Sequence, residues 1–330
     1  MTEFITSFEQ LLDPVAPETF FAEFHHRKPL HVSGSADKFA SVMSWRALNR
    51  MLEMDVWTPQ SMKLFVDAQQ VAPGAYCQRT VNRNQRQVMQ PDADMVVELA
   101  RRGASFLLNE IESLHPGVLS VVDTLQDRLG AKCSANLYCS WKERRAFDSH
   151  FDRHDAYVLQ IYGSKRWCIY EGRADNPIEH ELFTNVLQVE YDRMKGGVAQ
   201  ELEMRPGDIL YLPRGQFHDA LASSEVSVHV TFGCTEPVGL DWLTQLWNQA
   251  VQESVFRTEL PAATHGEKAL NAYLRTLFDR LQKIAFDQRG LELAMSLRNS
   301  NRIKHGRYDF PAVGPAPQRA DRTSSKSDVP

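Results

Sequence analysis

Residues 207–218 read Gly-Asp-Ile-Leu-Tyr-Leu-Pro-Arg-Gly-Gln-Phe-His, and this stretch has the pattern of two β-strands joined by a short connection. Gly207 suits a tight turn, and the run at 208–212, which is apolar from Ile209 onward, suits a strand. Pro213 ends that strand because proline has no backbone N–H to donate. His218 then stands where the next strand begins. The stretch therefore predicts adjacent strands, with a histidine at the start of the second.

Other short segments of the same character lie on both sides of this stretch. From about residue 132 onward they are rich in β-branched and aromatic residues and are separated by turn residues such as Gly163-Ser164. They read LYCSW (137–141), AYVLQIY (156–162), KRWCIY (165–170), NVLQVEY (185–191), DILYLP (208–213) and VSVHVTFG (226–233). Many short strands at this spacing favour a closed β-barrel or sandwich, which leaves no exposed sheet edges. We therefore expect a mainly β fold with flanking helices.

Four regions follow from the change in pattern along the chain. Residues 1–130 predict a mostly helical segment that packs on the barrel, with one short buried strand at 104–110. Residues 131–236 form the predicted barrel core. Residues 237–300 predict amphipathic helices that serve for dimerisation. Residues 301–330 have no apolar periodicity and predict a mostly disordered tail.

The composition of the chain argues against a nucleic-acid-coating, membrane-bound or secreted protein. The 330 residues carry a net charge of −5, which argues against bulk nucleic-acid binding. No apolar run approaches the roughly 20 residues that cross a bilayer, so no membrane association is expected. The first residues, MTEFITSFEQLLDP, do not have the form of a secretory signal. The five cysteines form no C-x-x-C pair, so we expect reduced thiols in a cytoplasmic protein.

A possible metal motif lies at Asp148-Ser-His150-Phe-Asp152. Residues i and i+2 of a strand point to the same face, so His150 and Asp152 can both enter a barrel interior. Alone, this H-x-D pair is weak, since the chain has eleven histidines and a surface polar pair would look the same. His218, 68 residues later, completes two histidines and one carboxylate. This is the facial triad of non-haem iron(II) oxygenases, so we predict that the three side chains bind iron.

These motifs resemble those of the JmjC-type cupin oxygenases of the ribosomal-oxygenase group, over about residues 17–235. The resemblance covers H-x-D and the pattern G-x5-P-x4-H at 207–218. It extends to FFAEFHHRKPLHV, ASFLLNEIESLHPGV, SANLYCSW and LQIYGSKRW. It implies a double-stranded β-helix, or jelly-roll, core. One departure is Ala222, where cupins often have asparagine four residues after the distal histidine.

The resemblance also implies a site for 2-oxoglutarate. Its far carboxylate is expected on Lys165, which lies fifteen residues after His150; a solvated turn lysine is the alternative. Alternation along the strand turns Lys165 inward and Arg166 outward. Asn136 matches a pocket asparagine of the family, and Tyr138 shares its face. Both could equally be ordinary hydrogen-bonded barrel residues.

Three further residues near these motifs are expected to lie outside the metal and 2-oxoglutarate sites. His154 continues the face of His150 and Asp152, and we expect it at the pocket edge or near the substrate rather than on the metal. His229 lies alone in a strand, where a histidine is usually a hydrogen-bonded core group. Asp155 is expected to be a supporting or surface acid.

The function implied by the resemblance is an iron(II)- and 2-oxoglutarate-dependent dioxygenase that uses O2 to hydroxylate a side chain of a protein or peptide, with a ribosomal protein as one candidate. Such proteins commonly carry a winged-helix domain after the dimerisation helices, and residues 301–330 are too short and polar for one. That departure leaves a small-molecule or natural-product peptide substrate open. The metal motif is also compatible with a non-catalytic metal-binding cupin and with a zinc-dependent isomerase or hydrolase.

Overall fold

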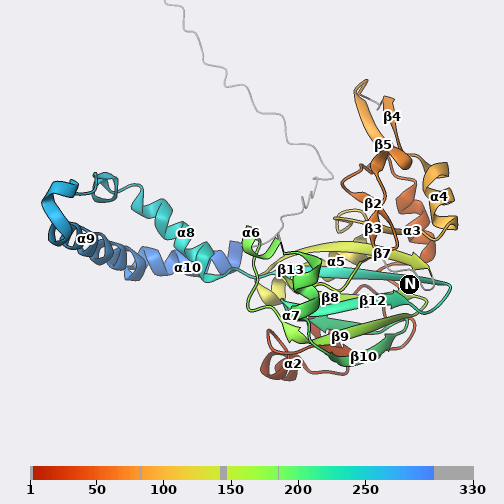
Figure 1. Ribbon diagram of the computed structural model, residues 1–330. Helices are drawn as coiled ribbons and strands as arrows, with labels where there is room; N and C mark the ends of the chain where they lie inside the picture. Colours follow the sequence, from red (N-terminus) through yellow and green to blue (C-terminus); the bar gives the residue numbers. More distant parts are fainter. Residues whose placement is uncertain (1–2, 82–83, 142–146, 185, 301–330) are drawn as a thin grey trace, which may run out of the picture.

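Two antiparallel sheets form the centre of the molecule (Figure 1). The computed structural model describes residues 3–81, 84–141, 147–184 and 186–300. Within these residues the larger sheet has the order β1-β11-β8-β13-β7-β6-β2-β3. Its central strands are β7 (Lys132–Trp141), β8 (Asp155–Tyr162), β11 (Ile209–Leu212) and β13 (Val226–Thr235). The smaller sheet has the order β10-β9-β12, with bounds Val198–Met204, Lys165–Arg173 and Gln216–Ala222.

The two sheets face each other across a small apolar core. Each sheet contributes one face of alternating residues, as expected when every second side chain of a strand points inward. The larger sheet contributes Ala156, Val158, Leu210 and Leu212, and the smaller one Trp167, Ile169, Leu202 and Met204. This arrangement confirms the predicted mainly β fold with flanking helices.

A larger core lies on the other face of the large sheet. The helices α1 (Phe8–Leu12), α2 (Pro17–Glu23) and α5 (Pro116–Leu129) pack there. Phe20 of α2 contacts the rings of Tyr157 and Tyr211, and all three side chains are fully buried. Burial of an aromatic side chain of this size stabilises the fold by roughly 2–3 kcal/mol. The N-terminal segment is therefore fixed to the barrel strand that follows the H-x-D motif.

The described part of the first 130 residues contains several strands besides its helices. Beside α3 (Trp45–Leu52) and α4 (Ala93–Arg101), the described part contains β1 (Leu30–Val32), β2 (Met62–Val66), β3 (Gln69–Gln70), β4 (Cys77–Val81), β5 (Gln87–Pro91) and β6 (Ser105–Leu108). The strand expected at 104–110 is confirmed as β6, which is buried throughout and pairs with β7. Most of the others are short, and β3 and β5 bury no side chain fully.

One predicted strand is wrong. The segment NVLQVEY (185–191) overlaps the helix α7 (Gln188–Met194), which follows the short helix α6 (Glu181–Thr184). Val189 and Tyr191 alternate with polar residues, and this alternation led to the prediction of a strand. Val189 is exposed, whereas Tyr191 packs on the rings of Phe151 and Phe217. The strand that the barrel uses is β10, in which Leu202 and Met204 point inward.

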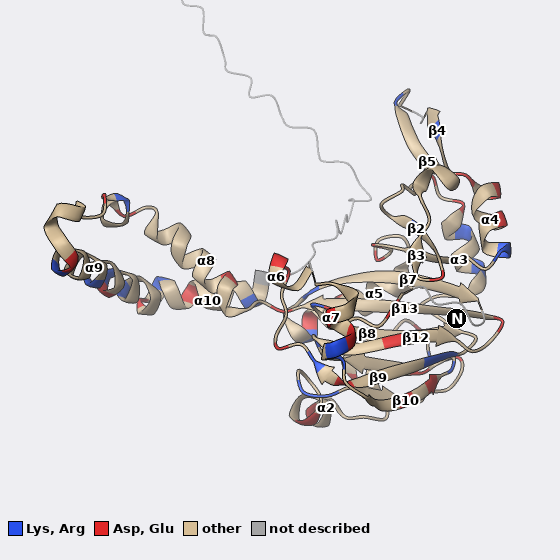
Figure 2. Ribbon diagram, in the orientation of Figure 1, with Lys and Arg blue, Asp and Glu red and all other residues tan. Residues whose placement is uncertain are grey.

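The C-terminal helices form an arm that projects away from the barrel (Figure 1). The arm consists of α8 (Gly239–Ala250), α9 (Gly266–Phe286) and α10 (Gln288–Ser300), held together by a small core around Leu246 and Ile284. Both signs of charge are interspersed along α9 (Figure 2). No described helix is long and apolar enough to span a membrane. The tail predicted at 301–330 lies outside the described residues.

Candidate metal centre

Two backbone hydrogen bonds bring the distant histidines of the predicted triad together. The N–H of His150 donates to the carbonyl of His218 at 3.0 Å, and the N–H of His218 donates to the carbonyl of His150 at 2.8 Å. This antiparallel bridge joins the segment before β8 to β12. The two imidazole rings lie side by side, with centroids 4.6 Å apart.

Asp152 meets the same point from the adjoining loop. Its carbonyl accepts a hydrogen bond from the N–H of Gly215 at 2.9 Å, which fixes the loop against the start of β12. Its Oδ2 lies 3.7 Å from Nε2 of His218. One potential ligand atom from each of His150, Asp152 and His218 lies within 4.8 Å of the others. The three side chains therefore converge, although the sequence separates them by up to 68 residues.

Both imidazoles direct Nε2, the nitrogen that can bind a metal here, toward the place where the three side chains converge. Nδ1 of His150 lies 2.7 Å from the carbonyl of Asp148, and Nδ1 of His218 lies 3.0 Å from the carbonyl of Gln216. A carbonyl can only accept, so each Nδ1 carries a proton, and in the neutral form of each ring Nε2 has the free lone pair. A second hydrogen bond of this kind orients histidine ligands in metal sites.

The charges at the site suit a cation. Burial lowers the pKa of His218 to about 4, and neighbouring His150 adds to the effect. His218 is therefore neutral near pH 7. Burial alone would raise the pKa of Asp152, but the imidazoles of His154, His218 and His150 outweigh it and hold that pKa below its ordinary value. An ionised carboxylate and a neutral imidazole are the forms that bind metals.

The triad and Lys165 line the same cavity between the two sheets. Lys165 is 4% exposed at the start of β9, while Arg166 points to solvent. Burial lowers the pKa of the Lys165 ammonium group to about 8, so it stays largely charged at neutral pH. Apolar walls close the cavity around it, contributed by Ala156, Val158, Trp167, Leu212 and Ala220. A cation in such a setting favours an anionic ligand group.

Tyr138 lines the cavity, whereas Asn136 is not among its lining residues. The side chains of the two hydrogen-bond each other, and Oδ1 of Asn136 also accepts from the N–H of Glu110 at 3.1 Å. Burial and the charge of Asp152 raise the pKa of the Tyr138 phenol, so it is a hydrogen-bond donor at neutral pH. Asn136 therefore reaches the cavity only through the hydroxyl that it orients.

His229 is a site residue that sequence reasoning missed. It is buried, as expected of a core group, but it was not expected to line the cavity or to leave a ring nitrogen without a partner in the described part of the chain. His229 lines the cavity and stacks flat on Tyr138, with ring centroids 4.7 Å apart. Its buried Nδ1 has no partner among the described residues. Burial, with Lys165 nearby, lowers its pKa well below the ordinary range, so the ring is neutral. Ser227 and Thr231 are polar and lie on the same strand face, and this polar face is the sequence feature that could have indicated a cavity residue.

The remaining polar residues near the motif lie outside the cavity lining. Nδ1 of His154 lies 3.3 Å from the carbonyl of Asp155, and the ring packs against Gly233. Asp155 is buried, and it accepts hydrogen bonds from the hydroxyl of Tyr211 at 2.7 Å and the N–H of Arg214 at 2.8 Å. Asp155 thus faces away from the triad, toward the N-terminal segment.

The model of the JmjC domain family matches residues 113–241, the part of the chain that holds the triad and Lys165. The chain is also similar to the ribosomal oxygenases. It is 26% identical over 252 residues to the bifunctional lysine-specific demethylase and histidyl-hydroxylase NO66 of Drosophila persimilis, covering 76% of this chain and 34% of that protein. It is 24% identical over 302 residues to ribosomal oxygenase 2 of Mus musculus, covering 83% and 60%. The chain thus spans about a third and three fifths of these relatives.

Solved structures agree on the fold. The structure of YcfD from Escherichia coli superposes with a TM-score of 0.58 at 15% identity, covering 92% of this chain and 76% of that one. A second structure, of YcfD described as a ribosomal oxygenase in complex with cobalt and 2-oxoglutarate, gives a TM-score of 0.57 at 13% identity, covering 92% and 75%. The predicted jelly-roll architecture is confirmed.

Proposed function

We propose that the chain is an iron(II)- and 2-oxoglutarate-dependent dioxygenase that hydroxylates a side chain of a protein or peptide. The observation that carries this proposal is one cavity lined by His150, Asp152 and His218 and also by a buried, charged Lys165. A metal-binding cupin without turnover has no need of that cation, and neither has a zinc isomerase or hydrolase.

The donor set fits iron(II). Two imidazole nitrogens and one carboxylate oxygen form the facial triad of non-haem iron oxygenases, which leaves coordination positions open for other ligands. Both Nε2 atoms carry their lone pairs toward the common point because both Nδ1 atoms donate to carbonyls. His150, Asp152 and His218 would therefore hold the metal.

The cavity also fits a dicarboxylate. Lys165 would pair with the far carboxylate of 2-oxoglutarate, and the surrounding apolar side chains would strengthen that ion pair by excluding water. Tyr138 would donate its hydroxyl proton to the same carboxylate, oriented by Asn136. The unpartnered Nδ1 of His229 marks a further polar atom at the cavity wall.

Bound iron, 2-oxoglutarate and O2 supply the oxidation of a C–H bond to an alcohol, with release of succinate and carbon dioxide. The protein's own contribution is positional. The bridge between His150 and His218 holds the metal ligands in place, and Lys165 sets the direction of the cosubstrate. The buried walls keep bulk water from the reacting groups.

For the substrate class, we favour a protein side chain because the relatives are named as ribosomal oxygenases and as a histidyl-hydroxylase. A ribosomal protein is the first candidate. Incubation of the enzyme with ribosomal proteins, iron(II) and 2-oxoglutarate should add the mass of one oxygen atom to one of them. A natural-product peptide is the alternative substrate if no ribosomal protein is modified.

A spectroscopic experiment tests cofactor binding. Anaerobic addition of iron(II) and 2-oxoglutarate should produce a weak visible charge-transfer band in the intact protein. Asp152→Ala should lose the band because it lacks one metal ligand, and Arg166→Met, which alters an exposed neighbour of the pocket lysine, should keep it. A fully iron-loaded protein without the band would favour a non-catalytic cupin or a zinc-dependent enzyme.

We further propose that two copies of the chain associate through the helical arm, and that the protein works in the cytoplasm. Apolar side chains of α8 and α9 line a groove on the arm, and two of its large rings, Trp247 and Phe278, are 69% and 68% exposed. Isolated exposed apolar residues are ordinary, but a contiguous groove of them indicates an association surface. A second arm offers the matching apolar face.

A further inference from the structure

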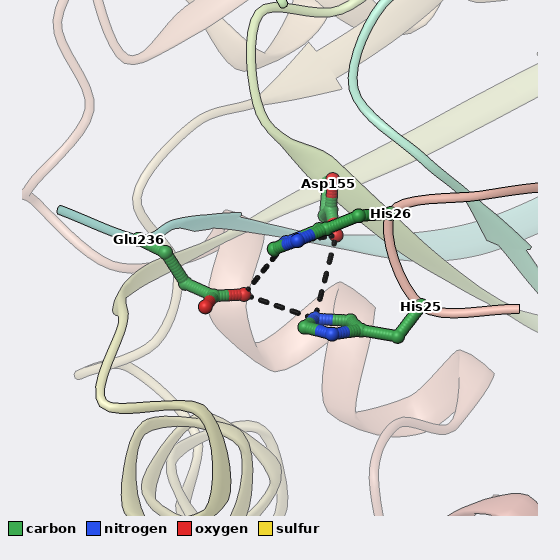
Figure 3. A group of neighbouring side chains, drawn as sticks. All are labelled: His25, His26, Asp155 and Glu236. Carbon is green, nitrogen blue, oxygen red and sulfur yellow. Dashed lines mark hydrogen bonds and ion pairs between the residues drawn. The ribbon is translucent and has the colours of Figure 1, made fainter. Parts of the chain in front are cut away.

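A second group of potential metal ligands lies outside the proposed active site (Figure 3). It consists of His25, His26, Asp155 and Glu236, and one ligand atom of each lies within 4.8 Å of the others. Nε2 of His25 and Nε2 of His26 lie 2.9 and 3.0 Å from Oε1 of Glu236. The same two nitrogens lie 3.8 and 3.4 Å from Oδ2 of Asp155. Two imidazoles and two carboxylates therefore point at one small volume.

Three distant chain segments are joined at this cluster. His25 and His26 follow α2, and Asp155 is the first residue of β8. Glu236 follows the end of β13, just before the helical arm begins. Asp155 pairs with Cys234 across the two strands, so the carboxylate of Glu236 comes to the same edge two residues later. The cluster is thus where the N-terminal segment, the barrel and the root of the arm meet.

The local backbone is arranged to make both rings face the carboxylates. His26 has a φ of +58°, a left-handed conformation that costs a residue other than glycine about 1 kcal/mol. This conformation lets two adjacent rings stack, with centroids 3.8 Å apart. The guanidinium of Arg173 donates to the carbonyls of His26 and Arg27 and holds the turn. Local strain retained by surrounding contacts often marks a functional position.

The spacing suits a tetrahedral zinc ion. Zinc bonds to nitrogen and oxygen are about 2.0–2.1 Å long, which separates neighbouring ligand atoms by about 3.3 Å in a tetrahedron. The four N···O separations, between 2.9 and 3.8 Å, bracket that value. Two ionised carboxylates with two neutral imidazoles carry a charge of −2, which a divalent cation would balance. Histidine and carboxylate ligands are also the types that zinc prefers.

Supporting hydrogen bonds and burial favour a built site over a surface ion pair. Asp155 is 5% exposed, His25 13% and Glu236 27%, while His26, at 52%, forms the solvent side of the cluster. The hydroxyl of Tyr211 donates to Oδ2 of Asp155 at 2.7 Å, and the N–H of His26 donates to that hydroxyl at 2.9 Å. One tyrosine therefore orients ligands from two segments, as outer contacts do in zinc sites.

A clamp of protonated histidines is the competing interpretation. In it, Nε2 of each ring carries a proton and donates to Oε1 of Glu236, and this contact raises the pKa of His26. Full protonation of both rings would place two like charges in a stack 3.8 Å apart, which is unfavourable. A metal ion instead needs both rings neutral, and it satisfies both carboxylates at once. We propose that His25, His26, Asp155 and Glu236 bind a structural zinc ion, separate from the triad, which fastens the N-terminal segment and the root of the helical arm to the barrel.

The test uses full-length protein in which the triad is disabled by His150→Ala and Asp152→Ala, so that bound zinc reports the second site alone. After chelator treatment and titration with Zn²⁺, elemental analysis should find one zinc per chain. Adding His25→Ala and His26→Ala should reduce this to none. His31→Ala is the matched control, because His31 pairs with Asp208 outside the cluster and its loss should leave the zinc bound.

Two further measurements keep the result decisive if the double histidine variant folds poorly. Glu236→Gln keeps the size of the side chain but removes its charge, and it should weaken zinc binding at least tenfold. Co²⁺ in place of zinc should give the intense visible absorption of a tetrahedral site. The proposal is overturned by folded, triad-disabled protein that takes up no zinc, or by zinc uptake that survives loss of both histidines. A stability that follows pH without bound zinc would establish the histidine clamp instead.

Discussion

Lys165 is a charged group buried at the wall of the cavity, and no carboxylate among the described residues forms an ion pair with it. Burial lowers the pKa of Lys165 from the ordinary 10.5 to about 8 because it disfavours the charged form. Between pH 8 and 10.5 the unfolded chain binds more protons at this position than the folded protein does. The stability of the ligand-free protein should therefore rise as the pH rises through that window, and the cost should be complete below pH 8.

Replacing this lysine should make the ligand-free protein more stable and less functional. At pH 7, Lys165→Met should raise the free energy of unfolding, by on the order of 3 kcal/mol at most. The gain should fade between pH 8 and 10.5, and binding of 2-oxoglutarate should be largely lost. Urea denaturation at pH 7 and pH 10 measures the first effect, and titration calorimetry measures the second. Arg166→Met should change neither, and a less stable Lys165→Met protein at pH 7 would refute this account of the buried charge.

At the scale of single elements, the turn that leads from β8 into β9 positions Lys165. Gly163 has a φ of +61°, and a Cβ placed there would lie 1.9 Å from the carbonyl oxygen of Val226. Gly163→Ala should therefore destabilise the protein by about 2 kcal/mol or more, and it should raise the 2-oxoglutarate requirement by displacing the start of β9.

Gly74→Ala is the control for this substitution, because a Cβ there meets nothing within 4 Å. Chemical unfolding of both variants and their 2-oxoglutarate dependence give the comparison. Equal stabilities of the two variants would show that the turn does not constrain the strand.

The elements that sequence could predict were those with two independent signals. The strands β8, β9, β11 and β13 combine apolar patterning with clear turn residues, and the triad combines three residues of metal-ligand type with motif spacing. The helix α7 was mistaken for a strand because seven residues fit either period, and contacts of Tyr191 with distant rings decide the outcome. A strand sequence also does not tell whether a single histidine points into the core or into a cavity. For this reason His229 was predicted to lie in the core and not at the cavity. No local pattern joins His25 to Glu236, which are 211 residues apart.

At the scale of the whole molecule, we expect the arm to determine the oligomeric state without affecting catalysis. Trp247→Asp puts a charge into the exposed apolar groove of α8 and α9, and it should turn a dimer into a monomer because burying that charge is unfavourable. Light scattering after size exclusion gives the mass directly. Trp45→Asp alters an exposed tryptophan on α3, away from the arm, and should stay dimeric. An intact protein that is monomeric at micromolar concentration would remove the proposed role of the groove.

The most direct measurement of the central claim is succinate formed in a single exposure to air. Protein loaded anaerobically with iron(II) and 2-oxoglutarate is mixed with air-saturated buffer and substrate, and succinate is quantified against the iron bound. We predict succinate in proportion to bound iron for the intact protein, and none above background for Asp152→Ala. Iron-loaded protein that binds 2-oxoglutarate yet forms no succinate would contradict the assignment of His150, Asp152, His218 and Lys165 to an oxygenase site.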